Sequence, residues 1–109
     1  MNRNDLREKL RERDRTKCHY CGVEEGDFPK IWGTFRHGRR GLTLEVDRKD
    51  NTKPHSLSNC VLACYTCNNA KSDVFSYEEF KVVGKAIRQI NQVKAKTANI
   101  ELTKDPNSN

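Results

Sequence analysis

With 109 residues, the chain is long enough for one domain over residues 1–109 and too short for a second core. Because 34% of the residues are hydrophobic and 33% are charged, that core must be thin and needs further support from disulfides, a metal or a partner subunit. The net charge of +6 favours a polyanion as partner. No run of about 18 apolar residues occurs and the N-terminus is charged throughout, which excludes a membrane span and a signal peptide and predicts a cytoplasmic protein with reduced thiols.

The first expected element is a helix over residues 5–14. Asn4 can cap it, and Leu6 and Leu10 fall on one face and make a narrow apolar stripe. So narrow a stripe predicts that the helix packs against the rest of the domain. After a Cys-x2-Cys turn, residues 23–41 hold turn formers and a basic run, and we expect them to be irregular.

Two strands are expected in the middle of the chain. Residues 42–47 alternate apolar and polar side chains, as a half-buried strand does. Residues 48–58 are polar and include a proline, which predicts a loop. Residues 60–63 then form the returning strand, in which Cys60 is expected to be a small buried hydrophobe rather than a metal ligand.

The last third of the chain carries the clearest helix signal. Ser76 and Glu79 form a capping box, and Phe75 and Phe80 stand at the spacing of a hydrophobic staple. Apolar residues then recur at steps of three and four. This pattern predicts a long amphipathic helix over residues 77–96.

The apolar stripe of this helix runs from Phe80 to Ile90. It either packs inside the domain or serves a homodimer, and the sequence leaves both open. Residues 98–109 end in KDPNSN and are expected to form a frayed tail.

Four cysteines form two Cys-x2-Cys pairs, Cys18 with Cys21 and Cys64 with Cys67. Two thiolates on one tight turn can occupy adjacent corners of a tetrahedron about 2.3 Å from a zinc ion, and the second turn fills the other two corners. The closed coordination sphere leaves no position for a substrate, so the site is predicted to hold structural zinc. A pair of disulfides and an iron centre are the alternatives for the same cysteines.

A basic segment over residues 30–40, KIWGTFRHGRR, is the expected contact with nucleic acid. Lys and Arg side chains neutralise phosphates, and no base-reading element is evident, so we expect little sequence preference. Trp32 and Phe35 lie among the basic residues and are more typical of a core than of stacking platforms. The candidate nucleic-acid-binding residues are Lys30, Arg36, His37, Arg39 and Arg40, with Lys71 farther along the chain.

The order of these features resembles the HNH endonucleases, also called His-Me finger or ββα-metal nucleases. The resemblance covers residues 18–73 and is most specific in LEVDRKDN-x7-N-CVLACYTCNNAKSD, over residues 44–73. It implies an α+β fold, a small zinc-stapled ββα-metal domain with flanking N- and C-terminal helices. It also implies a bacterial or phage-encoded endonuclease that acts on DNA with Mg²⁺ or Mn²⁺.

Carried over by position, the resemblance gives roles to three residues. Asp47 and Asn68 are the ligands of the divalent cation, and Asn59 braces the loop between the strands. Independently of the family, a carboxylate oxygen and an amide oxygen suit Mg²⁺ or Mn²⁺. Each ligand also has a plainer interpretation, Asp47 as a solvated strand-end acid and Asn68 as a helix cap.

Arg48 stands where the family has the histidine that acts as general base. An arginine stays protonated and cannot take a proton from water. In this respect the chain is similar to several phage and mobile-element members that carry Asp-Arg. His55 is the first candidate for the base, against its interpretation as a surface loop residue, and Asp50 is the second. In a third alternative no side-chain base is needed and Arg48 clamps the phosphate.

The sequence therefore predicts a metal-dependent DNA endonuclease with low sequence specificity. The alternative is a non-catalytic zinc module that binds nucleic acid, and Arg48 is the main observation in its favour. The acid-plus-asparagine pair separates the two, because a binding module has no reason to place Asp47 before the loop and Asn68 after Cys67.

Overall fold

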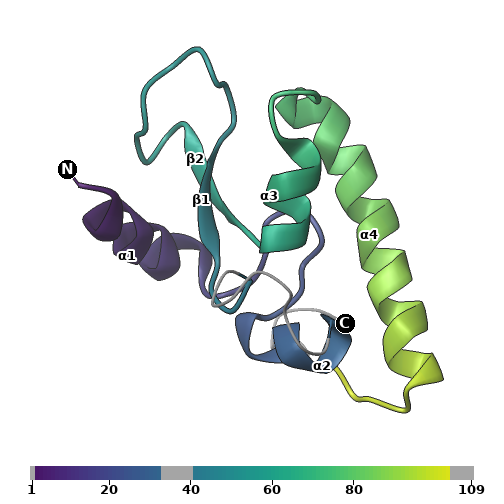
Figure 1. Cartoon of the computed structure of the whole chain (residues 1–109). Coiled ribbons are helices and arrows are strands. Elements are labelled where there is room, and N and C mark those ends of the chain that lie inside the picture. The colour runs from purple at the N-terminus through teal and green to yellow at the C-terminus, as the bar shows by residue number, and fades with distance from the viewer. Residues whose placement is uncertain (1, 33–40, 104–109) are drawn as a thin grey trace.

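The computed structural model describes residues 2–32 and 41–103, which form an α+β fold around a two-stranded antiparallel sheet (Figure 1). Helix α1 lies on one side of the sheet, and α3 and α4 lie on the other (Figure 1). In the described part of the chain, no helix combines the length and the apolar character needed to cross a membrane. The elements, in chain order, are α1 (Arg3–Asp14), the 3-10 helix η1 (Glu25–Asp27), α2 (Phe28–Trp32), β1 (Glu45–Arg48), β2 (Cys60–Ala63), α3 (Tyr65–Lys71) and α4 (Tyr77–Thr97).

The sheet pairs Glu45 with Ala63 at one end and Arg48 with Cys60 at the other. The returning strand is found where it was expected, and all four of its residues are buried. The first strand runs from Glu45 to Arg48 rather than over the expected 42–47, because these are the four residues that pair with β2. Among the residues of β1, Asp47 is the buried one.

Helix α1 begins at Arg3 rather than at residue 5. The expected cap, Asn4, is wrong, because the side chain of Asn2 accepts the hydrogen bond from the Asp5 N–H at 2.8 Å. Leu6 and Leu10 are buried in the core, and α1 packs beside β2, as the narrow stripe predicted.

The segment expected to be irregular contains two short helices, η1 and α2. Pro29 is the second residue of α2, a first-turn position where a missing N–H costs no hydrogen bond. The turn formers that predicted a loop are therefore compatible with a helix here. Phe28 is fully buried and its ring centroid lies 5.2 Å from that of Trp32, which packs against the core as its residue type predicted.

Helix α4 begins with the expected capping box. The Ser76 hydroxyl accepts from the Glu79 N–H, and the Glu79 carboxylate accepts from the Ser76 N–H. The ring centroids of Phe75 and Phe80 lie 5.9 Å apart, which confirms the staple. The helix ends at Thr97, one residue beyond the expected end.

The apolar stripe of α4 enters the core only over its first half. Phe80 is fully buried, and Val83 and Ile87 pack against the core. Ile90 is 53% exposed, because Asn91 and Ala95 form the buried face of the second half of the helix (Figure 1). Packing inside the domain therefore accounts for part of the stripe.

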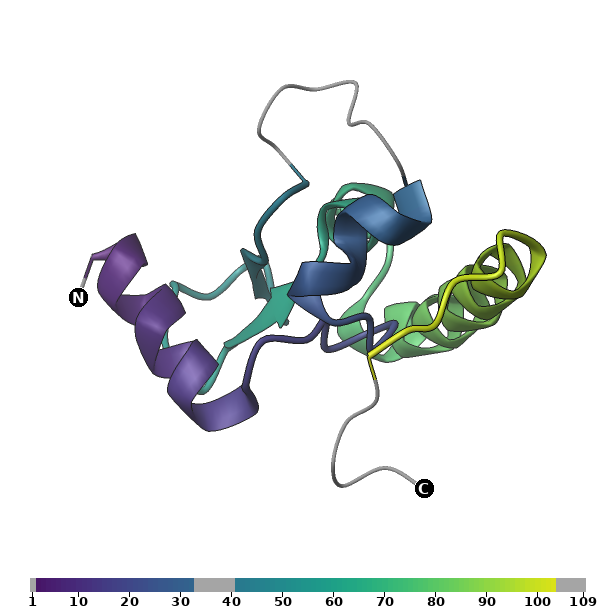
Figure 2. The same cartoon turned by 90° about the horizontal axis from the view of Figure 1, so that it is seen from below.

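Residues 98–103 do not form the frayed tail that was expected. After α4 the chain turns back towards η1 and α2 (Figure 2). The backbone N–H and the hydroxyl of Thr103 donate to the buried carboxylate of Asp27 at 2.7 and 2.9 Å. A buried carboxylate needs such donors, and they hold this segment in place. Residues 104–109 lie outside the described part of the chain.

Gly84 lies where α4 passes against the first cysteine turn. A Cβ here would stand 2.7 Å from both the Cβ and the carbonyl oxygen of Tyr20. Gly84→Ala should cost about 1–3 kcal/mol through overpacking, against a gain of about 1 kcal/mol in helix propensity. We expect a lower midpoint of urea unfolding. Gln89→Ala, exposed on the same helix, is the control; an unchanged midpoint for Gly84→Ala would contradict the close approach.

Candidate metal centres

The four paired cysteines meet in one buried cluster between the turn after α1 and the start of α3. Their sulfur atoms all lie within 4.8 Å of one another, and those of Cys21 and Cys64 are 3.8 Å apart. A tetrahedron that measures about 2.3 Å from its centre to each sulfur has edges of about 3.8 Å. The cluster therefore has the size that a zinc ion requires. All five cysteines are free thiols, and Cys60 is buried outside the cluster, as expected.

Hydrogen bonds within the cluster favour negative charge on the sulfur of Cys18. The Cys21 N–H lies 3.5 Å from the Cys18 sulfur, and the Cys67 N–H lies 3.3 Å from the Cys64 sulfur. Burial opposes ionisation of Cys18, but hydrogen bonds from the neighbouring thiols lower its pKa. Hydrogen bonds to Cys18 in turn raise the pKa of Cys64 and of Cys67. A thiolate is the form of cysteine that binds a metal, so the arrangement suits a metal ion.

Asp47 is buried on the face of β1 that looks towards α3. Its Oδ2 accepts the hydroxyl hydrogen of Tyr20 at 2.5 Å, and the Lys71 ammonium lies 3.4 Å from its Oδ1. Burial, followed by the hydrogen bond to Asp47, raises the pKa of Tyr20, so its hydroxyl remains a donor. With 6% of its surface exposed, Asp47 is not a solvated strand-end acid. Its carboxylate is held by a side chain from the first cysteine turn and one from the end of α3.

Asn68 faces the same space from α3. Its side-chain nitrogen donates to Oε1 of Glu45 at 2.8 Å. Glu45 and Asp47 are two residues apart in β1 and Asn68 and Lys71 three apart in α3, so each pair shares one face of its element. These four residues are called the β1–α3 cradle below. The helix begins at Tyr65, so Asn68 is neither its cap nor its first residue.

The cap of α3 is instead Cys64, whose sulfur accepts the hydrogen bond from the Cys67 N–H. The interpretation of Asn68 as a helix cap is therefore wrong, because the second cysteine turn is itself the first turn of the helix. A metal cluster at Cys64 and Cys67 therefore fixes the helix that presents Asn68.

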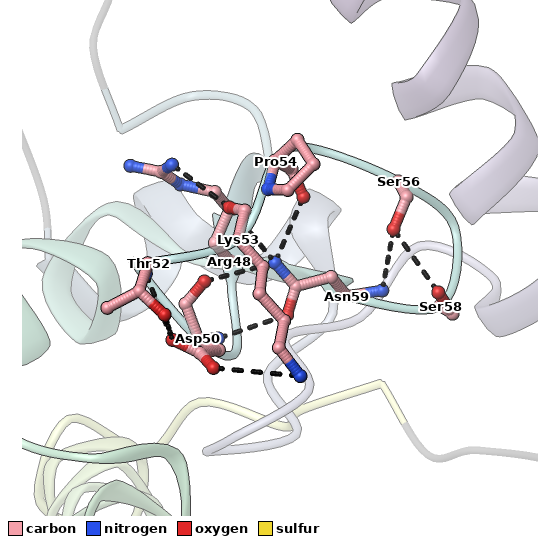
Figure 3. Close-up of polar contacts among 8 residues, drawn as sticks. All are labelled: Arg48, Asp50, Thr52, Lys53, Pro54, Ser56, Ser58 and Asn59. Atoms are coloured by element: carbon pink, nitrogen blue, oxygen red, sulfur yellow. Dashed lines mark hydrogen bonds and ion pairs between the residues drawn. The ribbon is translucent and has the colours of Figure 1, made fainter.

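Asn59 closes the loop between β1 and β2 (Figure 3). Its Oδ1 accepts from the Asp50 N–H at 3.1 Å, and its Nδ2 donates to the carbonyl oxygens of Asp50 and Pro54, each at 3.1 Å. The Arg48 guanidinium donates to the Lys53 carbonyl oxygen at 3.2 Å (Figure 3). These bonds tie the loop to the end of β1, where Arg48 stands beside the buried Asp47.

The strand, loop, strand and helix that carry this site match a family model described as HNH endonuclease, over residues 45–74. The solved structure of the rare-cutting HNH restriction endonuclease PacI superposes with a TM-score of 0.63 and 35% sequence identity, covering 78% of this chain and 57% of the PacI chain. The chain thus carries the HNH motif of this endonuclease family, over residues 45–74. The resemblance found in the sequence is thereby confirmed, as is the α+β fold that it implied.

A second relative of this HNH chain is YoqL, an SPbeta prophage-derived protein of Bacillus subtilis (strain 168) that is named an HNH endonuclease. It is 30% identical over 74 residues, which are 67% of this chain and 30% of YoqL. The chain thus spans about a third of YoqL and little more than half of PacI.

His55 does not lie with the strand-end acid of the HNH motif. Its exposed imidazole is 3.4 Å from the guanidinium of Arg3 on α1, across the sheet from α3. Partial burial and the charges of Arg3 and Arg48 lower its pKa. Asp50 is engaged within the loop, where hydrogen bonds from Thr52 lower its pKa. In the described part of the chain, the hydrogen bonds of His55 and Asp50 therefore lead away from Asp47.

Most of the expected nucleic-acid contacts of the HNH chain are outside the described residues. Lys30 is described, with a half-exposed side chain whose ammonium lies 2.8 Å from the buried Asp27 carboxylate. The expected contacts outside the described residues are Arg36, His37, Arg39 and Arg40.

The expectation that Lys71 extends the basic surface is wrong. Its side chain is 1% exposed, and its ammonium donates to the Arg48 carbonyl oxygen at 3.1 Å besides facing Asp47. The last turn of α3 lies against β1, which buries this face of the helix. Lys71 is therefore part of the β1–α3 cradle.

Sequence reasoning missed two residues of the HNH site, Tyr20 and Glu45. The signal for Glu45 is local, because a residue two positions before Asp47 in a strand shares its face. Tyr20 gives a weaker signal: it stands inside the first Cys-x2-Cys turn, which meets the sheet through tertiary contacts such as the bond from the His19 N–H to the Leu62 carbonyl oxygen.

Proposed function

We propose that this HNH domain is a metal-dependent DNA endonuclease that hydrolyses phosphodiester bonds, with a structural zinc ion in the cysteine cluster. The observation that carries the proposal is that the HNH match, residues 45–74, is the segment that forms the β1–α3 cradle. The donor set fits, because carboxylate and amide oxygens are the ligands that Mg²⁺ and Mn²⁺ prefer. The name of YoqL and the description of PacI as a restriction endonuclease support DNA as the substrate class.

In this proposal Asp47 and Asn68 hold the divalent cation, which when bound polarises the scissile phosphate and stabilises the leaving oxygen. Tyr20 keeps the Asp47 carboxylate oriented through Oδ2. Arg48, at the end of the same strand, offers a planar guanidinium that can bind two phosphate oxygens at once. The loop closed by Asn59 accepts a hydrogen bond from the Arg48 guanidinium and so holds it at the edge of the site.

Low sequence specificity is proposed on the ground that the basic segment is suited to phosphates. Lys30, Arg36, His37, Arg39 and Arg40 would neutralise the DNA backbone, which carries no sequence information. Cleavage of plasmids of unrelated sequence at similar rates would support this part of the proposal. Cutting at one short sequence alone would overturn it.

The direct test is to incubate supercoiled plasmid with the zinc-loaded chain in Mg²⁺, in Mn²⁺ or in EDTA. We expect nicked and linear DNA with the metals and none with EDTA. A non-catalytic zinc module, which Arg48 at the family's base position favours, would shift the plasmid on a gel without nicking it in either metal.

Arg48 and His55 are predicted to respond in opposite ways to removal. Arg48→Ala should lower the nicking rate about 10²–10³-fold, the typical effect of removing one charge-stabilising donor. His55→Ala should be nearly silent, because its imidazole lies on the α1 side of the sheet. Initial nicking rates of the two variants, measured from about pH 6 to about pH 9, test both expectations, because histidine titrates within this range.

The opposite pattern would identify His55 as the base. His55→Ala would then lose about 10²–10⁴-fold and recover in part at higher pH, where hydroxide replaces the missing base. Arg48→His, which restores the residue usual in the family, should keep or raise activity if this position faces the attacking water. Thermal unfolding of each variant separates a catalytic loss from a folding defect.

A further inference from the structure

Two pairs of side chains face each other between β1 and α3 in the cradle. Glu45 accepts from the Asn68 side-chain nitrogen at 2.8 Å, and Asp47 faces the Lys71 ammonium at 3.4 Å. The period of two along β1 and the spacing of three along α3 put the contacts side by side. Each of the two proposed cation ligands therefore has its own partner in the cradle.

The contact with Glu45 decides which end of the Asn68 amide is presented. An ionised carboxylate can only accept hydrogen bonds, so the amide nitrogen of Asn68 must be the atom that faces Glu45. The carbonyl oxygen is then directed away from Glu45. Only this oxygen can bind a hard cation, since an amide NH₂ group has no free electron pair to offer.

We infer that Glu45 is a positioning residue that holds the Asn68 amide with its carbonyl oxygen turned towards the divalent cation. The inference rests on the proposed function, because that function makes Asn68 a cation ligand. Without Glu45 the amide can turn about its last side-chain bond and present NH₂ in place of oxygen. Partners of metal ligands that act in this way commonly change metal affinity about 10–100-fold.

A purely structural role for Glu45 is disfavoured by how α3 is anchored. The backbone N–H of Asn68 bonds to the Cys64 carbonyl oxygen at 2.9 Å, and Cys64 and Cys67 tie the helix to the cysteine cluster. Lys71 makes a second attachment to β1. Glu45 is only partly buried. Its replacement should therefore leave the helix in place and alter the side chain of Asn68.

The test measures Mn²⁺ binding to the zinc-loaded full chain without DNA, through the electron paramagnetic resonance signal of free Mn²⁺. Glu45→Ala should raise the Kd for Mn²⁺ about 10–100-fold. Glu45→Gln keeps an oxygen that can accept from Asn68, so its Kd should lie nearer that of the wild type. Glu12→Ala, an exposed glutamate of α1, is the matched control and should leave the Kd unchanged.

A double-mutant comparison separates positioning from direct ligation. If Glu45 acts through Asn68, Glu45→Ala should have no further effect on the Kd once Asn68→Ala is present. Equal damage from Glu45→Gln and Glu45→Ala, or additive losses in the double variant, would show that the Glu45 charge acts by itself and would overturn the inference. So would a Kd for Glu45→Ala equal to that of the wild type.

The proposed hydrolysis can fail separately. A wild-type chain that binds Mn²⁺ with the expected variant pattern but never nicks plasmid would end the endonuclease proposal and support the positioning role. A wild-type chain that binds no Mn²⁺ would overturn the positioning role, whatever its activity with another ion.

Discussion

Chelation of the zinc ion proposed for the cysteine cluster should unfold the chain. The cluster joins the turn after α1 to the start of α3, and Cys21 and Cys64 are 43 positions apart. Zinc supplies about 10–16 kcal/mol of apparent folding free energy in small zinc domains, whereas a whole domain is stable by about 5–15 kcal/mol. We expect a chelator to remove the helical circular dichroism and the cooperative thermal transition, and added Zn²⁺ to restore both.

Cys64→Ser should have the same effect as the chelator, because it removes one of four ligands. Cys60→Ala is the matched control: Cys60 is as deeply buried as Cys64 but lies outside the cluster. This variant should keep both its zinc, by elemental analysis, and a cooperative transition. A chain that is free of zinc by the same analysis and still melts cooperatively would contradict a structural ion.

Features whose causes are local could be predicted from the sequence. The capping box of Ser76 and Glu79 and the Phe75–Phe80 staple are found as expected, since each partner lies within five residues of the other. The cysteine cluster is not local, yet its repeated Cys-x2-Cys spacing made it recognisable. The motif order around it was enough to identify the family.

Features set by tertiary contacts could not be predicted. Lys71 reads as a surface lysine, and it is buried because the cysteine turns fix which face of α3 meets β1. Asp27 and Thr103 are 76 positions apart, so no local sequence pattern predicts the hydrogen bond between them. Asn2 and Asn4 are equally suitable caps by residue type, and the hydrogen bond to Asp5 selects Asn2.

The candidate site divides in the same way. Motif position was enough to select Asp47 and Asn68, and both lie in the β1–α3 cradle. Their partners Glu45, Tyr20 and Lys71 come from pairing register and from the folded cysteine turns. The neighbours of a ligand depend on which faces of β1 and α3 meet, and a single sequence does not state this.

Asp47→Asn should abolish plasmid nicking, with a loss of about 10²–10³-fold or more, because it removes the negative charge that holds the cation. The same change leaves the buried Lys71 ammonium without its carboxylate, and an unpaired buried charge costs about 3–5 kcal/mol. A fall in the midpoint of thermal unfolding is therefore expected with the loss of activity, and the two effects must be separated.

The double change Asp47→Asn with Lys71→Met makes that separation. It removes the ammonium together with the carboxylate charge, and an apolar side chain of similar length fills the space. Stability should recover towards that of the wild type, while nicking stays absent because the cation still lacks its carboxylate. Asp73→Asn, an exposed acid just beyond α3, is the control and should nick normally. Full activity in either Asp47 variant would remove Asp47 from the cation site.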